Sequence, residues 1–173
     1  GNPSKLSHFR LSDNYLRFYL KFIKPNKDKV NQNRFEDINI EAFPGWRTIL
    51  GLQFENLVLK NRKKIWEKLG IKPEDIVADN PFFQRRKTLI KGCQIDYLIQ
   101  TRFNTLFACE FKFSTSELEI KTVYEVMDKL EDLILPRRFS CWPVLIHVNG
   151  VTESVIDQGY FTEIIDFSEF LEE

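Results

Sequence analysis

Three strand-like stretches follow one another in the middle of this chain, and they restrict the fold more than any other feature of the sequence. They cover about residues 76–86, 92–100 and 106–113, and β-branched and aromatic residues are frequent in them. Amphipathic helical patterns lie on both sides, over 46–69 and 116–135. Because a sheet must bury a face and these helices carry apolar stripes, the order predicts an α/β fold.

Two further strand-like stretches follow the second helical pattern, at 141–148 and 160–165, and a last helix begins near Ser168. The first of these stretches ends at Asn149-Gly150, a pair that is typical of tight turns. We therefore predict an α/β sandwich in which helices flank a central mixed sheet.

The first 45 residues have a different pattern, with short helical stretches and no strand signal. Ser12-Asp13 can cap a first helix, a polar loop covers 26–33, and a second helical segment covers 34–42. The first helix has a broad apolar surface formed by Tyr15, Leu16, Phe18, Tyr19, Phe22 and Ile23. We expect a helical linker or clasp over 1–45 and one domain over 46–173.

The charges of the chain balance, but they are distributed unevenly. Its 173 residues contain 25 Lys and Arg against 25 Asp and Glu. Residues 151–173 hold seven of these acids and no base, so residues 1–150 hold 25 bases and 18 acids. A net charge of zero therefore does not exclude a nucleic-acid partner. Two basic runs, 60–64 and 85–87 with nearby Lys91, are either phosphate contacts or ordinary solvated surface.

The three cysteines, Cys93, Cys109 and Cys141, lie far apart in strand-like stretches. Their odd number and the lack of a CxxC motif or zinc-type spacing indicate reduced thiols that pack in the core. The sequence has no apolar run near the ~20 residues that cross a membrane, and no secretory signal. We expect a cytoplasmic protein without a membrane partner.

Charged residues alternate with apolar ones in two of the predicted strands. In the third strand, Glu110 and Lys112 share one face, while a cysteine and three phenylalanines share the other. In the second strand, Asp96 alternates with Ile95 and Tyr97, which we expect on the opposite face. The sequence thus predicts a carboxylate and an amine on one strand, beside a carboxylate on its neighbour.

A hairpin around 101–105 would place Asp96 directly opposite Glu110. Opposed carboxylates repel, so a cation, a shared proton or a nearby lysine must offset them, and a divalent metal with oxygen ligands fits best. Lys112 could then orient or deprotonate water, or stabilise charge on a phosphate. Taken alone, Glu110 and Lys112 are better explained as an ordinary ion pair on a solvated strand. Only together with Asp96, Glu55 and the order of the elements do they favour the metal site.

Glu55 is a further candidate, because it lies within the apolar stripe of the helix predicted over 46–69. A carboxylate among apolar side chains is unfavourable without a partner, so we expect Glu55 to point toward the same metal. His147 lies in an apolar strand, has no partner evident in the sequence and is assigned no role. Lys121, in the first turn of the next helix, could also face the site and is a weaker candidate.

The spacing of these residues resembles the PD-(D/E)xK nuclease superfamily, although Ile95 stands where the signature has proline. The resemblance implies a restriction-endonuclease-like sandwich and a Mg²⁺ or Mn²⁺ ion. Asp96, Glu110 and the backbone carbonyl of Phe111 would be metal ligands, with Glu55 as an auxiliary ligand. Lys112 would be the catalytic lysine.

A closer resemblance covers nearly the whole chain. It is carried by LSDNYLRFY at 11–19, GLQFENLV at 51–58, ID at 95–96 and EFK at 110–112. These stretches resemble the uncharacterised C-terminal domain of archaeal-type AAA+ ATPases, in which an ATPase and a winged-helix segment precede this region. The resemblance implies an N-terminal ATPase domain as a partner in a longer protein. No GxxxxGK[ST] motif occurs in the sequence, so no ATP site is expected within it.

The sequence therefore supports two functional hypotheses. The first is a Mg²⁺- or Mn²⁺-dependent nuclease that hydrolyses phosphodiester bonds of DNA. The second is an inactive nuclease-fold module that docks nucleic acid or protein beside the ATPase. Aromatic residues of the first helix, which we expect to be exposed, motivate the second hypothesis: Tyr15, Phe18, Tyr19 and Phe22.

Overall fold

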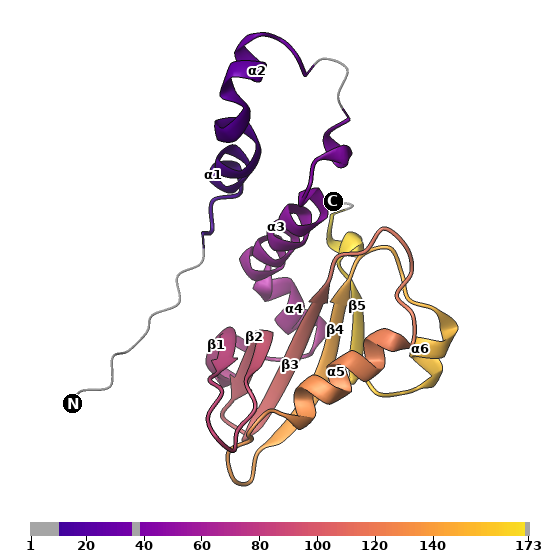
Figure 1. Ribbon diagram of the computed structural model, residues 1–173. Helices are drawn as coiled ribbons and strands as arrows, with labels where there is room; N and C mark the ends of the chain where they lie inside the picture. Colours follow the sequence, from indigo (N-terminus) through magenta and orange to yellow (C-terminus); the bar gives the residue numbers. More distant parts are fainter. Residues whose placement is uncertain (1–10, 36–38, 172–173) are drawn as a thin grey trace, which may run out of the picture. The chain divides into compact units, whose positions relative to one another are not determined.

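The computed structural model describes residues 11–35 and 39–171 of the chain (Figure 1). The chain forms two compact units, residues 1–56 and 57–173. The boundary between them falls within a helix, α3 (Trp46–Lys60).

Short helical segments form the first unit before α3 begins. They are α1 (Asn14–Phe18), η1 (Tyr19–Ile23), η2 (Lys24–Asn26), α2 (Lys27–Asn31) and η3 (Ile40–Ala42). Asp13 caps α1 as expected, because its carboxylate accepts a hydrogen bond of 2.8 Å from the N–H of Leu16. The loop predicted over 26–33 is wrong, since it contains α2. In the segment predicted as a helix over 34–42, residues 36–38 lie outside the described part and only η3 is helical.

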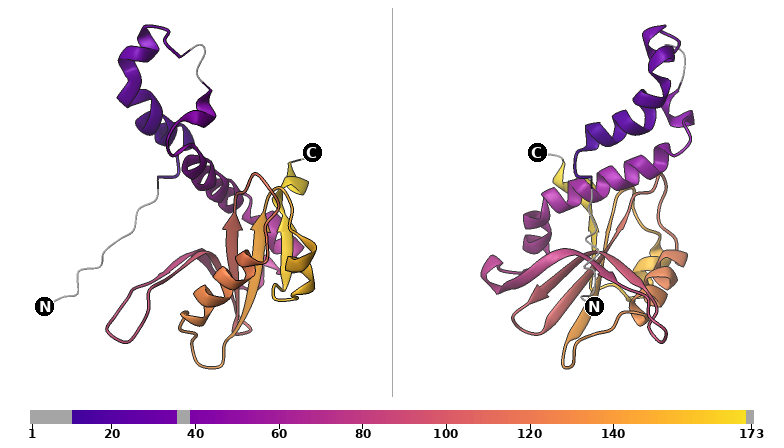
Figure 2. Two further views of the ribbon diagram at one scale, coloured as in Figure 1. Left: turned by 45° about the vertical axis from the view of Figure 1, so that its right-hand side comes forward. Right: turned by 60° about the vertical axis from the view of Figure 1, so that its left-hand side comes forward.

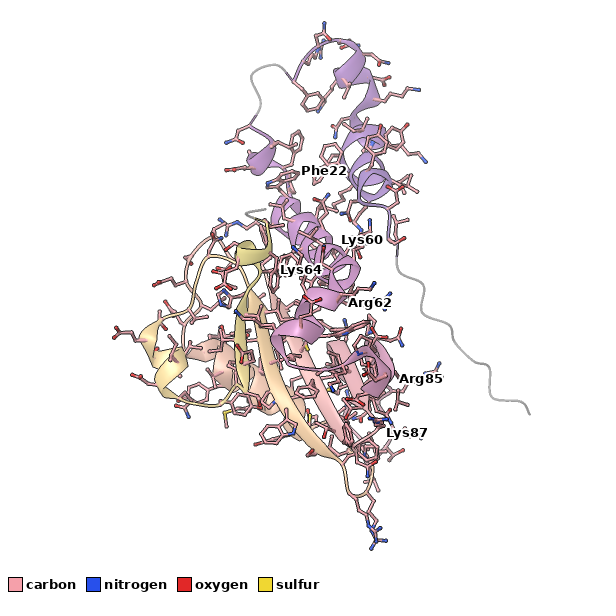
Figure 3. The ribbon with its side chains drawn as sticks, turned by 180° about the vertical axis from the view of Figure 1, so that it is seen from behind. Phe22, Lys60, Arg62, Lys64, Arg85 and Lys87 are labelled. Atoms are coloured by element: carbon pink, nitrogen blue, oxygen red, sulfur yellow. The ribbon has the colours of Figure 1, made fainter. Side chains whose placement is uncertain are left out.

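An aromatic cluster around Phe22 forms the core of the first unit (Figure 3). The Phe22 ring lies 5.4 Å from that of Phe18, 5.7 Å from Phe43 and 5.8 Å from Trp46. Phe22 is therefore buried, which corrects the expectation that this residue is exposed. Tyr15 does remain 73% exposed. The aromatic surface available for docking is smaller than the sequence indicates, because part of it packs against the unit's own rings.

A five-stranded mixed sheet forms the centre of the second unit (Figure 1). Its strands lie in chain order: β1 (Ile76–Gln84), β2 (Cys93–Thr101), β3 (Thr105–Lys112), β4 (Ser140–His147) and β5 (Glu163–Asp166). β1, β2 and β3 are antiparallel neighbours, whereas β3, β4 and β5 are parallel. The predicted α/β class with a mixed sheet is confirmed.

Helices pack on both faces of this sheet. Figure 1 shows α5 (Lys121–Glu131) in front of the sheet, and Figure 3 shows α4 (Arg62–Lys68) on the other face. Shorter segments are η4 (Pro73–Asp75), α6 (Glu153–Asp157) and η5 (Phe167–Phe170). Parallel neighbours need a crossover connection, which α5 supplies between β3 and β4 and α6 supplies between β4 and β5.

The helix predicted over 46–69 is interrupted, because α3 ends at Lys60 and α4 begins after Asn61. The side chain of Asn61 donates to the carbonyl of Leu57 at 2.9 Å, a local bond that competes with regular helix geometry. Two other predicted helices are shorter than expected. The helix predicted over 116–135 is regular only in α5, and the last helix is a 3₁₀ turn, η5.

A hydrogen-bond network around the buried Tyr97 connects α4 to the first two strands. The indole N–H of Trp66 donates to the hydroxyl of Tyr97 at 2.7 Å, and this hydroxyl donates to Asp79 at 2.8 Å. Arg62 forms an ion pair with the same carboxylate at 3.1 Å. Tyr97 is fully buried, so its hydroxyl is a polar group that the core tolerates because both partners are present.

Tyr97→Phe should destabilise the second unit by about 1–3 kcal/mol, because it removes both hydrogen bonds of the buried Tyr97 hydroxyl. Urea unfolding followed by tryptophan fluorescence measures the change. Tyr124→Phe is the matched control, since Tyr124 is 51% exposed and should change stability by less than about 0.5 kcal/mol. Equal stability of wild type and Tyr97→Phe would show that the network contributes nothing.

Candidate functional site

Alternation along β3 brings Glu110 and Lys112 together, as the sequence predicts. The Lys112 ammonium lies 3.3 Å from Oε1 of Glu110, so both side chains are on one face of the strand. Glu110 is only 6% exposed, although a carboxylate in a strand is usually solvated. The simpler interpretation is thus correct that the two residues form an ion pair but wrong that the pair is solvated, because the carboxylate is buried and only Lys112 is partly exposed.

Lys129 of α5 is the second partner of Glu110, and the sequence analysis missed it. Its ammonium lies 2.5 Å from Oε2 of Glu110, so each oxygen of this carboxylate faces one ammonium. Lys129 follows the buried residues Thr122 and Val126 by seven and three positions, which places it on the helix face that packs on the sheet. That spacing was the available signal, but it requires knowing which face of α5 is buried.

Glu125 and Lys121 extend this charge network along the same helix. Glu125 lies 3.3 Å from Lys112 and 3.7 Å from Lys121, the residue one turn before it. Lys121 is 82% exposed at its side chain and does not contact Glu110 in the described structure. It is therefore a peripheral member of the network.

The environment of Lys112 keeps this residue positively charged. Partial burial lowers the pKa of its ammonium, but the charges of Glu110 and Glu125 outweigh that effect and raise it above 10.5. A lysine with a raised pKa is a poor base at neutral pH. The geometry thus favours a role for Lys112 in stabilising negative charge over one in deprotonating water.

Asp96 lies at an irregularity of β2 that the sequence did not indicate. The pairing of β1 with β2 shifts between Asn80 and Phe82, so Asp96 and Tyr97 face the single residue Pro81, which has no N–H to donate. Ile95 consequently packs with Ala108 and Leu98, and not on the face of Tyr97. The expectation that Ile95 and Tyr97 share a face is therefore wrong.

The bulge directs the Asp96 side chain toward β3. The β2–β3 register runs from Gln100–Leu106 to Tyr97–Cys109, and one further step would place Asp96 opposite Glu110, as predicted. The regular strand pairing ends at Tyr97–Cys109, and beyond it Oδ2 of Asp96 accepts a hydrogen bond of 2.9 Å from the backbone N–H of Phe111. The two carboxylates therefore come from adjacent positions on neighbouring strands.

Glu55 is on α3 in the first unit, whereas Asp96, Glu110 and Lys112 are in the second. That Glu55 lies near the other three residues stays a prediction.

The described residues contain no group of three or more His, Cys, Asp or Glu side chains arranged to hold a metal. Mg²⁺ commonly takes one or two carboxylates and completes its shell with water and substrate oxygens. The oxygen donors at Asp96, Glu110 and Phe111 fit such an ion chemically.

His147 lies beside the site in the sheet register, between Lys112 on β3 and Asp166 on β5. It is 3% exposed, and within the described part of the chain its Nδ1 has no hydrogen-bond partner. Burial lowers the pKa of the imidazole, although the charge of Asp166 acts in the opposite direction. The imidazole is therefore neutral at physiological pH.

The basic run of α4 is used partly within the protein. Arg62 pairs with Asp79, Lys64 donates to the carbonyl of Phe170 at 2.9 Å, and Lys68 lies 3.2 Å from Glu169. Within the described residues, the 3₁₀ turn η5 of the C-terminal segment thus lies against α4. By contrast, Arg85, Arg86 and Lys87 are exposed on the β1–β2 connection. Figure 3 labels residues of both basic regions.

The three cysteines are free thiols, as expected, and Cys93 and Cys109 are buried. Among the described residues, no helix combines the length and the apolar character that crossing a membrane requires.

Comparisons of the sequence with models of known protein families and with curated proteins found no match.

His147→Leu should make the free energy of unfolding depend less on pH below about pH 7.5. Because the folded state lowers the pKa of His147, the unfolded state binds the proton first as pH falls below about 6.5. The wild-type free energy of unfolding should therefore decrease between about pH 7.5 and 5.5, and the variant should lose less over the same range. Urea midpoints measure this, and an NMR titration of the imidazole identifies the group. An identical pH dependence in both proteins would contradict the assignment.

Proposed function

We propose that the second unit is a nuclease-type domain of the PD-(D/E)xK kind that hydrolyses phosphodiester bonds in DNA. The observation that carries this proposal is the buried Glu110 carboxylate with Lys112 at 3.3 Å, one strand away from Asp96. Burying a carboxylate is unfavourable without a compensating partner, and a buried acid beside a partly buried lysine is frequent at functional sites. The restriction-endonuclease-like topology remains part of the proposal.

Each residue has a defined task in this proposal. Asp96, Glu110 and the carbonyl of Phe111 would hold Mg²⁺ or Mn²⁺, which would supply Lewis acidity and a nucleophilic water at the phosphate. Lys112 remains an ammonium and stabilises the negative charge that develops on the phosphate oxygens. The N–H of Phe111 fixes the orientation of the Asp96 carboxylate.

Lys129 has a separate task, because its ammonium occupies Oε2 of Glu110. This contact neutralises the buried carboxylate when only the protein's own groups are present. A divalent ion at Glu110 would experience repulsion from that ammonium. Lys129 would therefore weaken metal binding until it moves away from Glu110.

An inactive docking module is the second candidate, and the same contact favours it. With Lys112 and Lys129 on its two oxygens, Glu110 is satisfied without any metal. Such a module would bind nucleic acid or a protein beside the ATPase domain that the resemblance implies. Metal affinity distinguishes the two candidates.

Purified protein with Mn²⁺ should cleave DNA, and EDTA should stop the reaction. Asp96→Asn keeps an oxygen that can accept from Phe111 but removes the charge, so it should abolish Mn²⁺ binding in calorimetry. Lys112→Met should keep metal binding and lower the cleavage rate at least about 100-fold. Asp157→Asn, an exposed residue of α6, is the matched control and should behave as wild type. A wild-type protein that neither binds Mn²⁺ nor cuts DNA would favour the docking module.

Lys129→Met should raise the Mn²⁺ affinity on the order of tenfold, because it removes a positive charge beside Glu110. Lys121→Met is the control, since this lysine contacts Glu125 and not Glu110 in the described structure. Calorimetry gives the affinity, and a urea midpoint shows whether each variant is folded. Unchanged or weaker metal binding in folded Lys129→Met would contradict the role of Lys129.

A further inference from the structure

The β1–β2 connection is an exposed arm with basic residues around an apolar tip. Lys87 and Ile90 exchange backbone hydrogen bonds of 2.9 and 3.2 Å, which leaves Thr88 and Leu89 as a two-residue turn. Leu89 is 96% exposed, the highest value among the large apolar side chains described. In the left view of Figure 2 the connection stands away from the sheet. We name residues 85–91 the basic arm.

The base of the basic arm is fixed to the C-terminal end of α5. The Gln84 side chain donates to the carbonyl of Asp132 at 2.7 Å and accepts from the N–H of Ile134 at 2.9 Å. Lys91 pairs with the Asp132 carboxylate at 2.9 Å. These contacts lie one turn beyond Lys129, whose ammonium holds Glu110. The arm is therefore anchored beside the acid–lysine cluster, the group formed by Glu110, Lys112 and Lys129.

The positive charge of the arm indicates that its binding partner is a polyanion. Residues 80–95 contain four basic residues and no acidic one. Arg85, Arg86 and Lys87 are exposed on the stretch that leads to the tip. DNA carries a charge about every 1.7 Å of its axis, so a short basic ribbon can contact several phosphates at once.

Among polyanionic partners, duplex DNA fits the single apolar side chain at the tip best. Proteins that bend DNA insert one Leu, Ile or Phe between base steps while basic residues hold the phosphates. Anchoring to an anionic membrane instead needs a larger apolar surface, since one side chain buries little area. Leu89 lies five residues beyond Gln84, a reach of about 15 Å for an extended ribbon, which exceeds the ~8 Å depth of either groove.

We propose that the basic arm binds duplex DNA, with Arg85, Arg86 and Lys87 on phosphates and Leu89 wedged at a base step in the minor groove. This inference deepens the proposed function, because it names duplex DNA as the substrate that is presented to the acid–lysine cluster. The binding itself does not depend on hydrolysis, so the two proposals are tested separately.

The test measures binding of the whole chain to a duplex of about 20 base pairs, in EDTA, over about 50–200 mM salt. The triple variant Arg85→Gln, Arg86→Gln, Lys87→Gln should bind at least about tenfold more weakly. Its plot of log affinity against log salt should be less steep by about 2–3. Leu89→Ala should keep the wild-type salt dependence and lose the rise in 2-aminopurine fluorescence that reports an unstacked base step.

Phe103→Ala is the matched control, because Phe103 is a 65% exposed apolar residue on the β2–β3 turn and should leave both signals unchanged. Failure of wild type to bind duplex, or wild-type binding by the triple variant, would overturn the proposal. Stronger binding to single strands, or Leu89-dependent binding to phosphatidylserine vesicles without duplex binding, would also overturn it. Duplex binding that needs the arm, without Mn²⁺-dependent cleavage, would leave the arm established and refute only the nuclease.

Discussion

The centre of the second unit depends on the ion pairs that the buried carboxylate of Glu110 forms with two lysines. It lies on β3 with an ammonium at each oxygen, Lys112 from its own strand and Lys129 from α5. Because an uncompensated buried charge is very costly, the contact with Lys129 favours the position in which α5 packs on the sheet through Val123 and Val126. The same compensation makes the site tunable, since any cation that binds Glu110 must compete with a lysine.

The first strands of the sheet show how backbone irregularity serves this centre. Pro81 cannot donate to β2, and the pairing shifts at Asp96 and Tyr97. The bulge turns Asp96 toward the N–H of Phe111, while Tyr97 is held by Trp66 and Asp79. Bulges commonly redirect a side chain beside a functional site, and here the neighbouring network holds the bulge in place.

The acidic and basic segments that the sequence separates also lie in different places in the second unit. Part of the acidic C-terminal segment lies against α4, where Glu169 pairs with Lys68 and the carbonyl of Phe170 accepts from Lys64. On the β1–β2 connection, Arg85, Arg86 and Lys87 are exposed, and Lys91 pairs with Asp132. A basic surface therefore lies near the end of α5, although the net charge of the whole chain is zero.

Local patterns in the sequence were enough to determine the α/β class, the five strands and the shared face of Glu110 and Lys112, because alternation and turn residues act over a few positions. Helix ends were less predictable, since the break after α3 depends on a local hydrogen bond of the Asn61 side chain, and the polar residues of 27–31 form a helix despite their loop-like composition. The partnership of Glu110 with Lys129 and the bulge at Asp96 were decided only by tertiary structure. Both arise from packing between elements far apart in the chain, and the periodicity of a single element carries no information about its neighbour.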